Sequence, residues 1–138
     1  MLIFLLSFKH FQKINKSILI ASEKSDYKNQ LVKMLSETLK KKGFYIKVID
    51  VTYDSAPIDS VKIDDWKSII IINSIKAGRL NWYVENFIVS NNLDSKIVLI
   101  NISDSGDAKT DHNIDAITTA SNMNQIETIK DLILDRVE

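Results

Sequence analysis

Polar side chains gather directly after an uncharged apolar segment near the amino end. Residues 17–21 read Ser-Ile-Leu-Ile-Ala, and this run predicts a short buried strand that leads into a polar loop and then a helix starting near Gln30. A loop that enters a helix presents N–H groups at the positive end of the helix dipole, so it favours binding of a phosphate or another anion. The candidate ligand-binding residues here are Ser22, Lys24, Ser25, Tyr27 and Asn29.

Two more polar segments follow apolar runs in the same way. Residues 68–72 and 96–102 are rich in isoleucine, and both predict central strands that are covered on two faces. The carboxyl ends of parallel strands meet at one edge of a sheet, where ligands of open α/β folds bind. The candidate residues after these strands are Asn73, Ser74, Ile75 and Gly78, and then Ser103, Asp104, Ser105 and Gly106.

The remaining chemically active side chains form no recognised pattern. Asp104, Asp107, Asp111 and His112 have the spacing of neither a calcium loop nor a helical zinc pair, so they predict a solvated loop. Neither histidine has a Ser or Asp partner pattern typical of nucleophilic catalysis. The chain has no cysteine, which excludes disulfides and thiolate metal sites. We therefore predict no catalytic residue and no metal site.

Alternating strands and helices position the candidate loops. This order predicts a three-layer α/β domain with a mostly parallel sheet between helices. The crossovers at residues 52–65 and 103–113 have room for little helix, so we expect reduced helical cover on one face. The expected strands are residues 17–21, 44–51, 68–72, 96–102 and 114–118, and the expected helices are residues 30–42, 80–91 and 126–137.

Size and charge limit the classes of partner. The chain has 138 residues, the length of one domain, and its 18 basic residues balance 18 acidic ones. Without an excess of positive charge we expect no nucleic acid partner. We assign residues 17–138 to the domain and residues 1–16 to an apolar, amphipathic extension. Its apolar run is shorter than the ~20 residues of a spanning helix. The extension predicts either a helix lying on the domain or an anchor at a membrane surface, in a protein that is cytoplasmic or peripheral at a membrane.

Three segments resemble the flavodoxin-like family, and the resemblance covers roughly residues 17–138. Residues 20–27 lie where the family has its Ser/Thr-rich phosphate loop. Residues 71–80, with Val84 and Phe87, match the strand–glycine loop–helix passage of short flavodoxin domains related to flavodoxin-type protoporphyrinogen oxidases. Residues 98–106 lie where the family closes over its flavin.

The resemblance implies a sheet of order 2-1-3-4-5 with FMN bound at its carboxyl edge, in the cleft between strands one and three. It assigns Ser22, Ser25, Tyr27 and Asn29 to the phosphate, and residues 73–79 and 103–107 to the flavin ring. The sequence departs from the family at Ser25, where the loop usually carries glycine, and at Lys28, where it carries a hydroxyl; Glu23 and Asp26 add negative charge.

Two functions are therefore open at this stage. The first is an FMN-binding electron-transfer or quinone-linked redox module, whose partner is a redox protein or a quinone. The second is a cofactor-free flavodoxin-like interaction module. In that case residues 1–16 would contact a membrane surface or a second copy of the chain.

Overall fold

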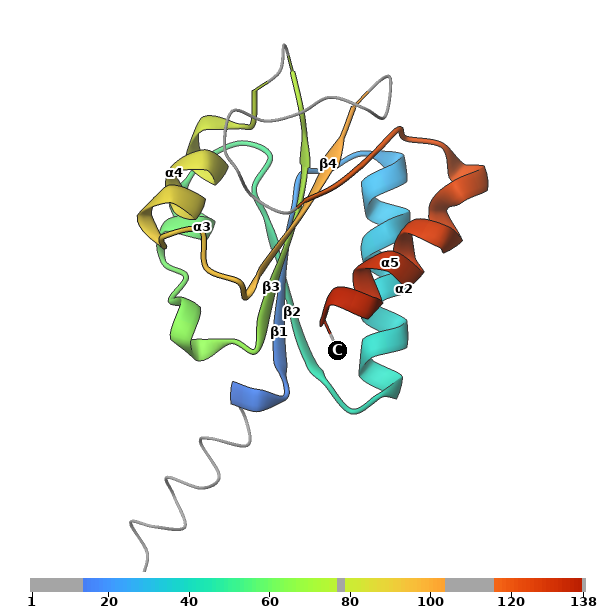
Figure 1. Ribbon diagram of the computed structural model, residues 1–138, viewed down its shortest axis with the longest axis horizontal. Helices are drawn as coiled ribbons and strands as arrows, with labels where there is room; N and C mark the ends of the chain where they lie inside the picture. The colour runs from blue at the N-terminus through green and yellow to red at the C-terminus, as the bar shows by residue number, and fades with distance from the viewer. Residues whose placement is uncertain (1–13, 77–78, 104–115, 138) are drawn as a thin grey trace, which may run out of the picture.

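One parallel sheet organises the molecule (Figure 1). The structure is a computed structural model, and it describes residues 14–76, 79–103 and 116–137. The five strands lie in the order β2-β1-β3-β4-β5, and every neighbouring pair is parallel. The strands are β1 (Ser17–Ser22), β2 (Tyr45–Asp50), β3 (Ser68–Ser74), β4 (Ile97–Ile102) and β5 (Ala116–Thr119). The predicted three-layer α/β fold and its strand order are confirmed.

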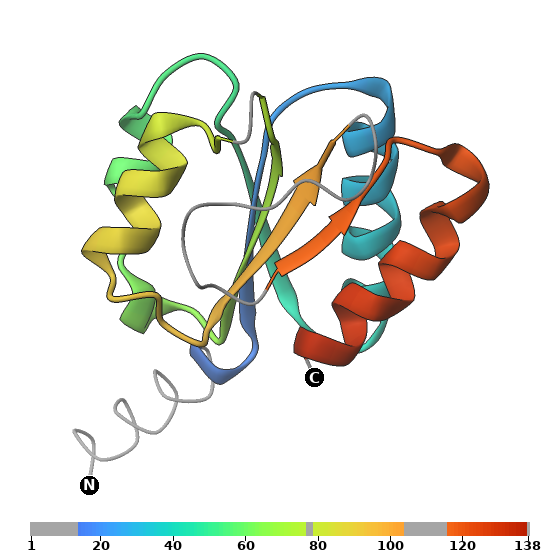
Figure 2. The ribbon, with the colours of Figure 1, turned by 45° about the horizontal axis from the view of Figure 1, so that its top comes forward.

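Helices cover the two faces of the sheet unequally (Figure 2). Helices α2 (Asp26–Lys41) and α5 (Ile126–Val137) pack on one face, and α4 (Trp82–Ser90) and the single-turn α3 (Ala56–Asp59) pack on the other. Short 3-10 turns precede β3 and α5, at Ile63–Asp65 and Met123–Gln125. Among the described residues, the α3/α4 face therefore has the smaller helical cover, as the short crossover at residues 52–65 predicts. Most of the second short crossover, residues 103–113, lies outside the described residues.

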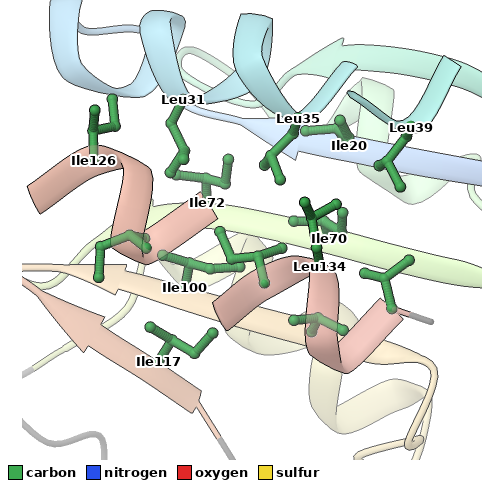
Figure 3. Close-up of a cluster of buried hydrophobic side chains, with 14 of the residues drawn as sticks. Ile20, Leu31, Leu35, Leu39, Ile70, Ile72, Ile100, Ile117, Ile126 and Leu134 are labelled. Atoms are coloured by element: carbon green, nitrogen blue, oxygen red, sulfur yellow. The ribbon is translucent and has the colours of Figure 1, made fainter. Parts of the chain in front are cut away.

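Strand alternation divides the core into two layers. Even-numbered positions of β1 and β3, such as Ile20 and Ile70, face α2 and α5, whereas odd-numbered positions such as Leu19 and Ile71 face α3 and α4. Figure 3 shows the first layer, in which leucines from α2 lie over isoleucines of the sheet. At the outer edge of the sheet, β2 leaves Tyr45 half exposed. Because both faces of the three inner strands are covered, their residues are buried almost without interruption.

The start of α2 differs from the prediction. The helix begins at Asp26 and not near Gln30, because Ser25 is its N-cap and accepts a hydrogen bond from the N–H of Lys28 at 3.2 Å. Tyr27 and Asn29 are therefore helical residues and not loop residues. The helix ends at Lys41, and Gly43 follows it with φ of 93°, a left-handed conformation that favours glycine.

Two strand ends also differ from the prediction. Strand β3 continues through Asn73 to Ser74, whereas the apolar run ends at residue 72. The extension is possible because β4 provides partners for both residues, in the register Asn73 with Asn101 and Ser74 with Ile102. Strand β5 ends at Thr119, one residue beyond the predicted end at residue 118, and it is described from Ala116 onward, because residues 114 and 115 lie outside the described residues.

The amino-terminal extension is described only from residue 14 onward. Within the described ranges, no helix has the length and apolar character needed to cross a membrane.

Tyr83 ties α4 to the loop after β2. Its hydroxyl donates to the carbonyl oxygens of Val51 at 2.6 Å and Thr52 at 3.0 Å. Tyr83→Phe removes both hydrogen bonds and leaves the buried Val51 carbonyl without this donor, so we expect the free energy of unfolding to fall by about 1.5 kcal/mol. Urea denaturation measures this change. Tyr53→Phe is the control, because its side chain is 80% exposed; equal midpoints for the two variants would contradict the prediction.

Candidate functional site

The carboxyl edge between β1 and β3 is the candidate site. The chain proceeds from β1 to β2 on one side and from β3 to β4 on the other, so the direction of the connections reverses between these two central strands. Ligands of open α/β sheets bind at such a reversal. The N–H of Glu23 donates to the carbonyl of Ile72 at 3.2 Å, so the loop that follows β1 is attached directly to β3.

Three residues contact one another at the carboxyl edge between β1 and β3. The N–H of Ser74, at the end of β3, donates to Oε1 of Glu23 at 2.6 Å. The hydroxyl of Ser74 accepts a short hydrogen bond from Nζ of Lys28, in the first turn of α2. The same ammonium lies 3.8 Å from Oε1 of Glu23. We call Glu23, Lys28 and Ser74 the switch-point network, since it joins the loop, the helix and the strand that border the cleft.

The electrostatics of Lys28 are unusual for a lysine. Its side chain is only 8% exposed, and burial lowers the pKa of Lys28, an effect that Glu23 opposes and Lys76 reinforces. A cation in the first helical turn also meets the positive end of the helix dipole. Glu23 supplies the negative charge that compensates this buried ammonium. The ion pair therefore fixes the position of the Lys28 side chain.

Groups in the predicted phosphate loop are largely engaged with one another. The hydroxyl of Ser22 donates to the carbonyl of Glu23 at 2.8 Å, and the N–H of Lys24 donates to Oγ1 of Thr52 at 2.7 Å. The ammonium of Lys24 lies 3.5 Å from Asp50 at an exposed position. A hydrogen bond from the Thr52 hydroxyl is the main cause that lowers the pKa of Asp50.

The two other residues assigned to the phosphate lie on α2. Asn29 is exposed and, with Ser22 and Lys24, lines a small pocket of about 150 Å³ on the β2 side. Tyr27 is buried in the core layer between α2, α5 and the sheet. Burial raises the pKa of Tyr27, and the nearby Thr119 offsets part of this effect. Its helical position thus places the Tyr27 side chain in the core.

Two buried asparagines lie side by side near the carboxyl ends of β3 and β4. Asn73 and Asn101 pair in the sheet register, are 0% and 1% exposed, and lie on the α3/α4 face. Both polar atoms of the Asn73 amide and Oδ1 of Asn101 have no hydrogen-bond partner within the part of the chain that the structure describes. Unpartnered buried amides are rare and call for an explanation such as a ligand or a water. The sequence prediction missed Asn101, although an asparagine inside an apolar strand was a visible signal.

A groove of about 410 Å³ opens beside the network, at the start of α4. Its lining includes Ser74, the carboxylates of Glu23 and Glu85, and the cations of Lys76 and Arg79. The backbones of Lys76 and Arg79 exchange two hydrogen bonds of 3.0 Å. Trp82 is 65% exposed and meets the Tyr83 ring edge to face, with 5.2 Å between the centroids. The groove combines cations, hydrogen-bond donors and an aromatic surface, and can therefore accept a planar ligand with polar edges.

The predicted residues are thus brought together only in part. Ser74 lines the groove, and the Ile75 N–H donates to the Ile102 carbonyl at 3.0 Å. The N–H of Ser103 donates to the Thr119 carbonyl at 2.9 Å. The predicted solvated loop with its aspartates and His112 lies outside the described residues, as do the candidates Gly78, Asp104, Ser105 and Gly106. Lys76 and Arg79 belong to residues 73–79, which the resemblance assigned to the flavin ring, whereas Glu23, Lys28 and Trp82 were not among the predicted site residues, because their contacts depend on the fold.

The site fits the two ends of FMN differently. The groove suits a ring with hydrogen-bonding edges, and Asn73 and Asn101 are buried on the same side of the sheet without lining it. The phosphate end is opposed, because the Glu23 carboxylate already accepts the Ser74 N–H and pairs with Lys28, while Asp26 adds a second negative charge in the first turn of α2. The described residues therefore fit the ring of FMN and oppose its dianionic phosphate while Glu23 is in place.

Solved structures share this fold at low sequence identity. Flavodoxin 2 from Bacillus cereus is 14% identical, with TM-score 0.56 over 87% of this chain and 97% of its own. A flavodoxin from the domain Archaea is 13% identical, with TM-score 0.54 over 88% of this chain and 96% of its own. A Thermotoga maritima flavoprotein is 15% identical, with TM-score 0.59 over 97% of this chain.

Several of the similar structures are much longer proteins. The chain spans 40% of the length of the Thermotoga flavoprotein and 35% of rubredoxin oxygen:oxidoreductase from Desulfovibrio gigas. The sequence matches no protein-family model and no curated protein. At these identities the likeness establishes the architecture alone: the chain has the flavodoxin-like fold.

Proposed function

We propose that this protein is a redox module that binds FMN at the carboxyl edge of its sheet and exchanges electrons with a partner protein or a quinone. The observation that carries the proposal is the pair of buried asparagines: both polar atoms of the Asn73 amide and Oδ1 of Asn101 have no hydrogen-bond partner within the described residues. They lie on the α4 side of the edge, which is also the side of the 410 Å³ groove. Bound FMN would supply the electron-transfer chemistry.

Each part of the cofactor has candidate partners in the chain. The strand ends at Asn73, Ser74, Ile75 and Ser103 would border the ring. The helix start at Ser25 and Asp26 would provide N–H donors for the phosphate, with Lys24 as an exposed cation. The role of the protein is to orient the ring and to set the charge around it.

Ser25→Asp separates phosphate binding from folding. Aspartate is as good an N-cap as serine, so the variant keeps the start of α2 and its stability should change by less than ~0.5 kcal/mol. Its carboxylate would repel the phosphate, so we expect FMN affinity to fall about tenfold or more. Titration of flavin fluorescence quenching measures this affinity, and thermal melts report stability.

Ser25→Ala is the complementary control. It removes both a hydroxyl donor and the helix cap, so it should lower stability by about 1 kcal/mol and weaken FMN roughly tenfold. Unchanged FMN affinity in both variants would exclude this loop as the phosphate site. Wild-type protein that quenches no flavin fluorescence would refute the redox proposal as a whole.

The second candidate is a cofactor-free interaction module, and the closed switch-point network favours it. Glu23, Lys28 and Ser74 already satisfy one another at the position where a cofactor would bind. In this alternative the chain would contact a partner, a membrane surface or a second copy through residues 1–16. The FMN titration separates the two functions, because this one requires no flavin affinity.

A further inference from the structure

We infer that Glu23 is an internal anion that occupies an anion-binding position beside the loop, between the Ser74 N–H and the Lys28 ammonium, and makes this edge select against phosphate-bearing ligands. In its flavin form the inference rests on the proposed function. Its consequence for inorganic phosphate is independent of any flavin, since it concerns only the contacts of Glu23.

The contacts of Glu23 are those of a bound anion. Its side chain is 13% exposed, although glutamate is usually solvated at the surface. Oε1 accepts the Ser74 N–H at 2.6 Å and faces the buried Lys28 ammonium at 3.8 Å. A backbone N–H at a strand end and a cation in the first turn of α2 are donors that phosphate also uses.

Covalent attachment gives Glu23 an advantage over a free anion. The backbone N–H of Glu23 donates a hydrogen bond to the Ile72 carbonyl at 3.2 Å, so the side chain is held next to Ser74 and Lys28. A tethered group competes at a high effective concentration, and a free phosphate must displace it before reaching Ser74. The displaced carboxylate would then repel the dianion that replaced it. A flavin without phosphate avoids this competition.

Removal of the carboxylate would leave a vacant donor set. In Glu23→Ala the Ser74 N–H and the Lys28 ammonium lose their shared acceptor, and Lys76 adds positive charge close to Lys28. The variant should be less stable than wild type, because it buries an uncompensated cation. An added anion should restore part of that stability by binding the folded state.

The first test uses inorganic phosphate and thermal melts of the full chain at constant ionic strength. We expect phosphate to raise the Tm of Glu23→Ala by about 5 °C at a concentration tenfold above Kd. Wild type should shift by less than 1 °C or so. Asp26→Asn is the matched control, because it removes one negative charge from an exposed position at the start of α2 and leaves the contacts of Glu23 in place; it should behave as wild type does.

The second test compares riboflavin with FMN. Glu23→Gln keeps the shape of the side chain and an oxygen that can accept a hydrogen bond from the Ser74 N–H. It therefore also replaces Glu23→Ala as the test variant if Glu23→Ala does not fold. We expect Glu23→Gln to shift the affinity ratio about tenfold toward FMN, with riboflavin affinity nearly unchanged. It should also gain a phosphate-dependent rise in Tm.

The outcomes separate the inference from the proposed function. A phosphate-dependent gain in the Glu23 variants, with no flavin bound by any protein, would support the inference and refute the redox proposal. Flavin binding with an unchanged FMN-to-riboflavin ratio and no gain with phosphate would overturn the inference and leave the redox proposal standing. An equal phosphate shift in wild type and Glu23→Ala would also overturn it.

Discussion

Lys28→Met is expected to lower the free energy of unfolding by about 3 kcal/mol. Removal of one member of a buried ion pair leaves the other without its counter-charge, which typically costs 3–5 kcal/mol. We expect the lower end of that range, because Glu23 retains its hydrogen bond from the Ser74 N–H and its side chain is 13% exposed. Urea denaturation with a constant m-value measures the change.

A double variant tests whether the loss comes from the pair and not from packing. Glu23→Gln combined with Lys28→Met removes both charges, so most of the stability should return and the double variant should lie within about 1 kcal/mol of wild type. Lys33→Met is the control, because Lys33 is an exposed residue of the same helix. A loss in Lys28→Met no larger than in Lys33→Met would show that the pair contributes nothing to stability.

Asn73→Leu is expected to have opposite effects on stability and on flavin binding. The Asn73 amide is completely buried, and neither of its polar atoms has a partner within the described part of the chain. An unpaired buried amide costs about 1–3 kcal/mol. Leucine has a similar branched shape without polar atoms, so the variant should gain about 1–2 kcal/mol. If the Asn73 amide forms hydrogen bonds with the ring of FMN, the same change should weaken flavin binding at least tenfold.

Thermal melts and flavin titration of the same preparation measure both effects. Asn91→Leu is the control, because the Asn91 amide donates to the Phe87 carbonyl at 2.8 Å. That variant loses a satisfied hydrogen bond and should be destabilised by about 1 kcal/mol, without any change in flavin affinity. If Asn73→Leu is also destabilised, the Asn73 amide has partners, such as ordered waters, that make it favourable in the core.

Local sequence patterns were sufficient to predict the architecture. Isoleucine-rich runs such as residues 68–72 have no polar face, and this marks a strand covered on both sides. The spacing of Leu31, Leu35 and Leu39 marks one apolar helix face, which packs on the sheet as expected. These signals depend on the burial of a whole face, so neighbouring residues reinforce one another.

The ends of the elements were less predictable, because one side chain decides them. From the sequence, Ser25 can be a loop residue or a helix N-cap. In the structure its hydroxyl oxygen accepts a hydrogen bond from the Lys28 N–H, so it is the N-cap. That single choice places Tyr27 in the core. The partners of Glu23 were beyond prediction from the sequence, because Ser74 is 51 residues away along the chain and meets Glu23 only through the pairing of β1 with β3.

This long separation has a consequence for folding kinetics. The unit formed by β1, α2 and β2 contains Glu23 and Lys28, but the network is complete only when β3 has docked beside β1. Closing such a long stretch of chain costs entropy before the contact is gained, and we expect this network to form after the main folding barrier. Late contacts mainly slow unfolding and hardly change the rate of folding. The buried charges at the sheet edge would then mainly slow unfolding, so they determine how long the domain stays folded more than how fast it folds.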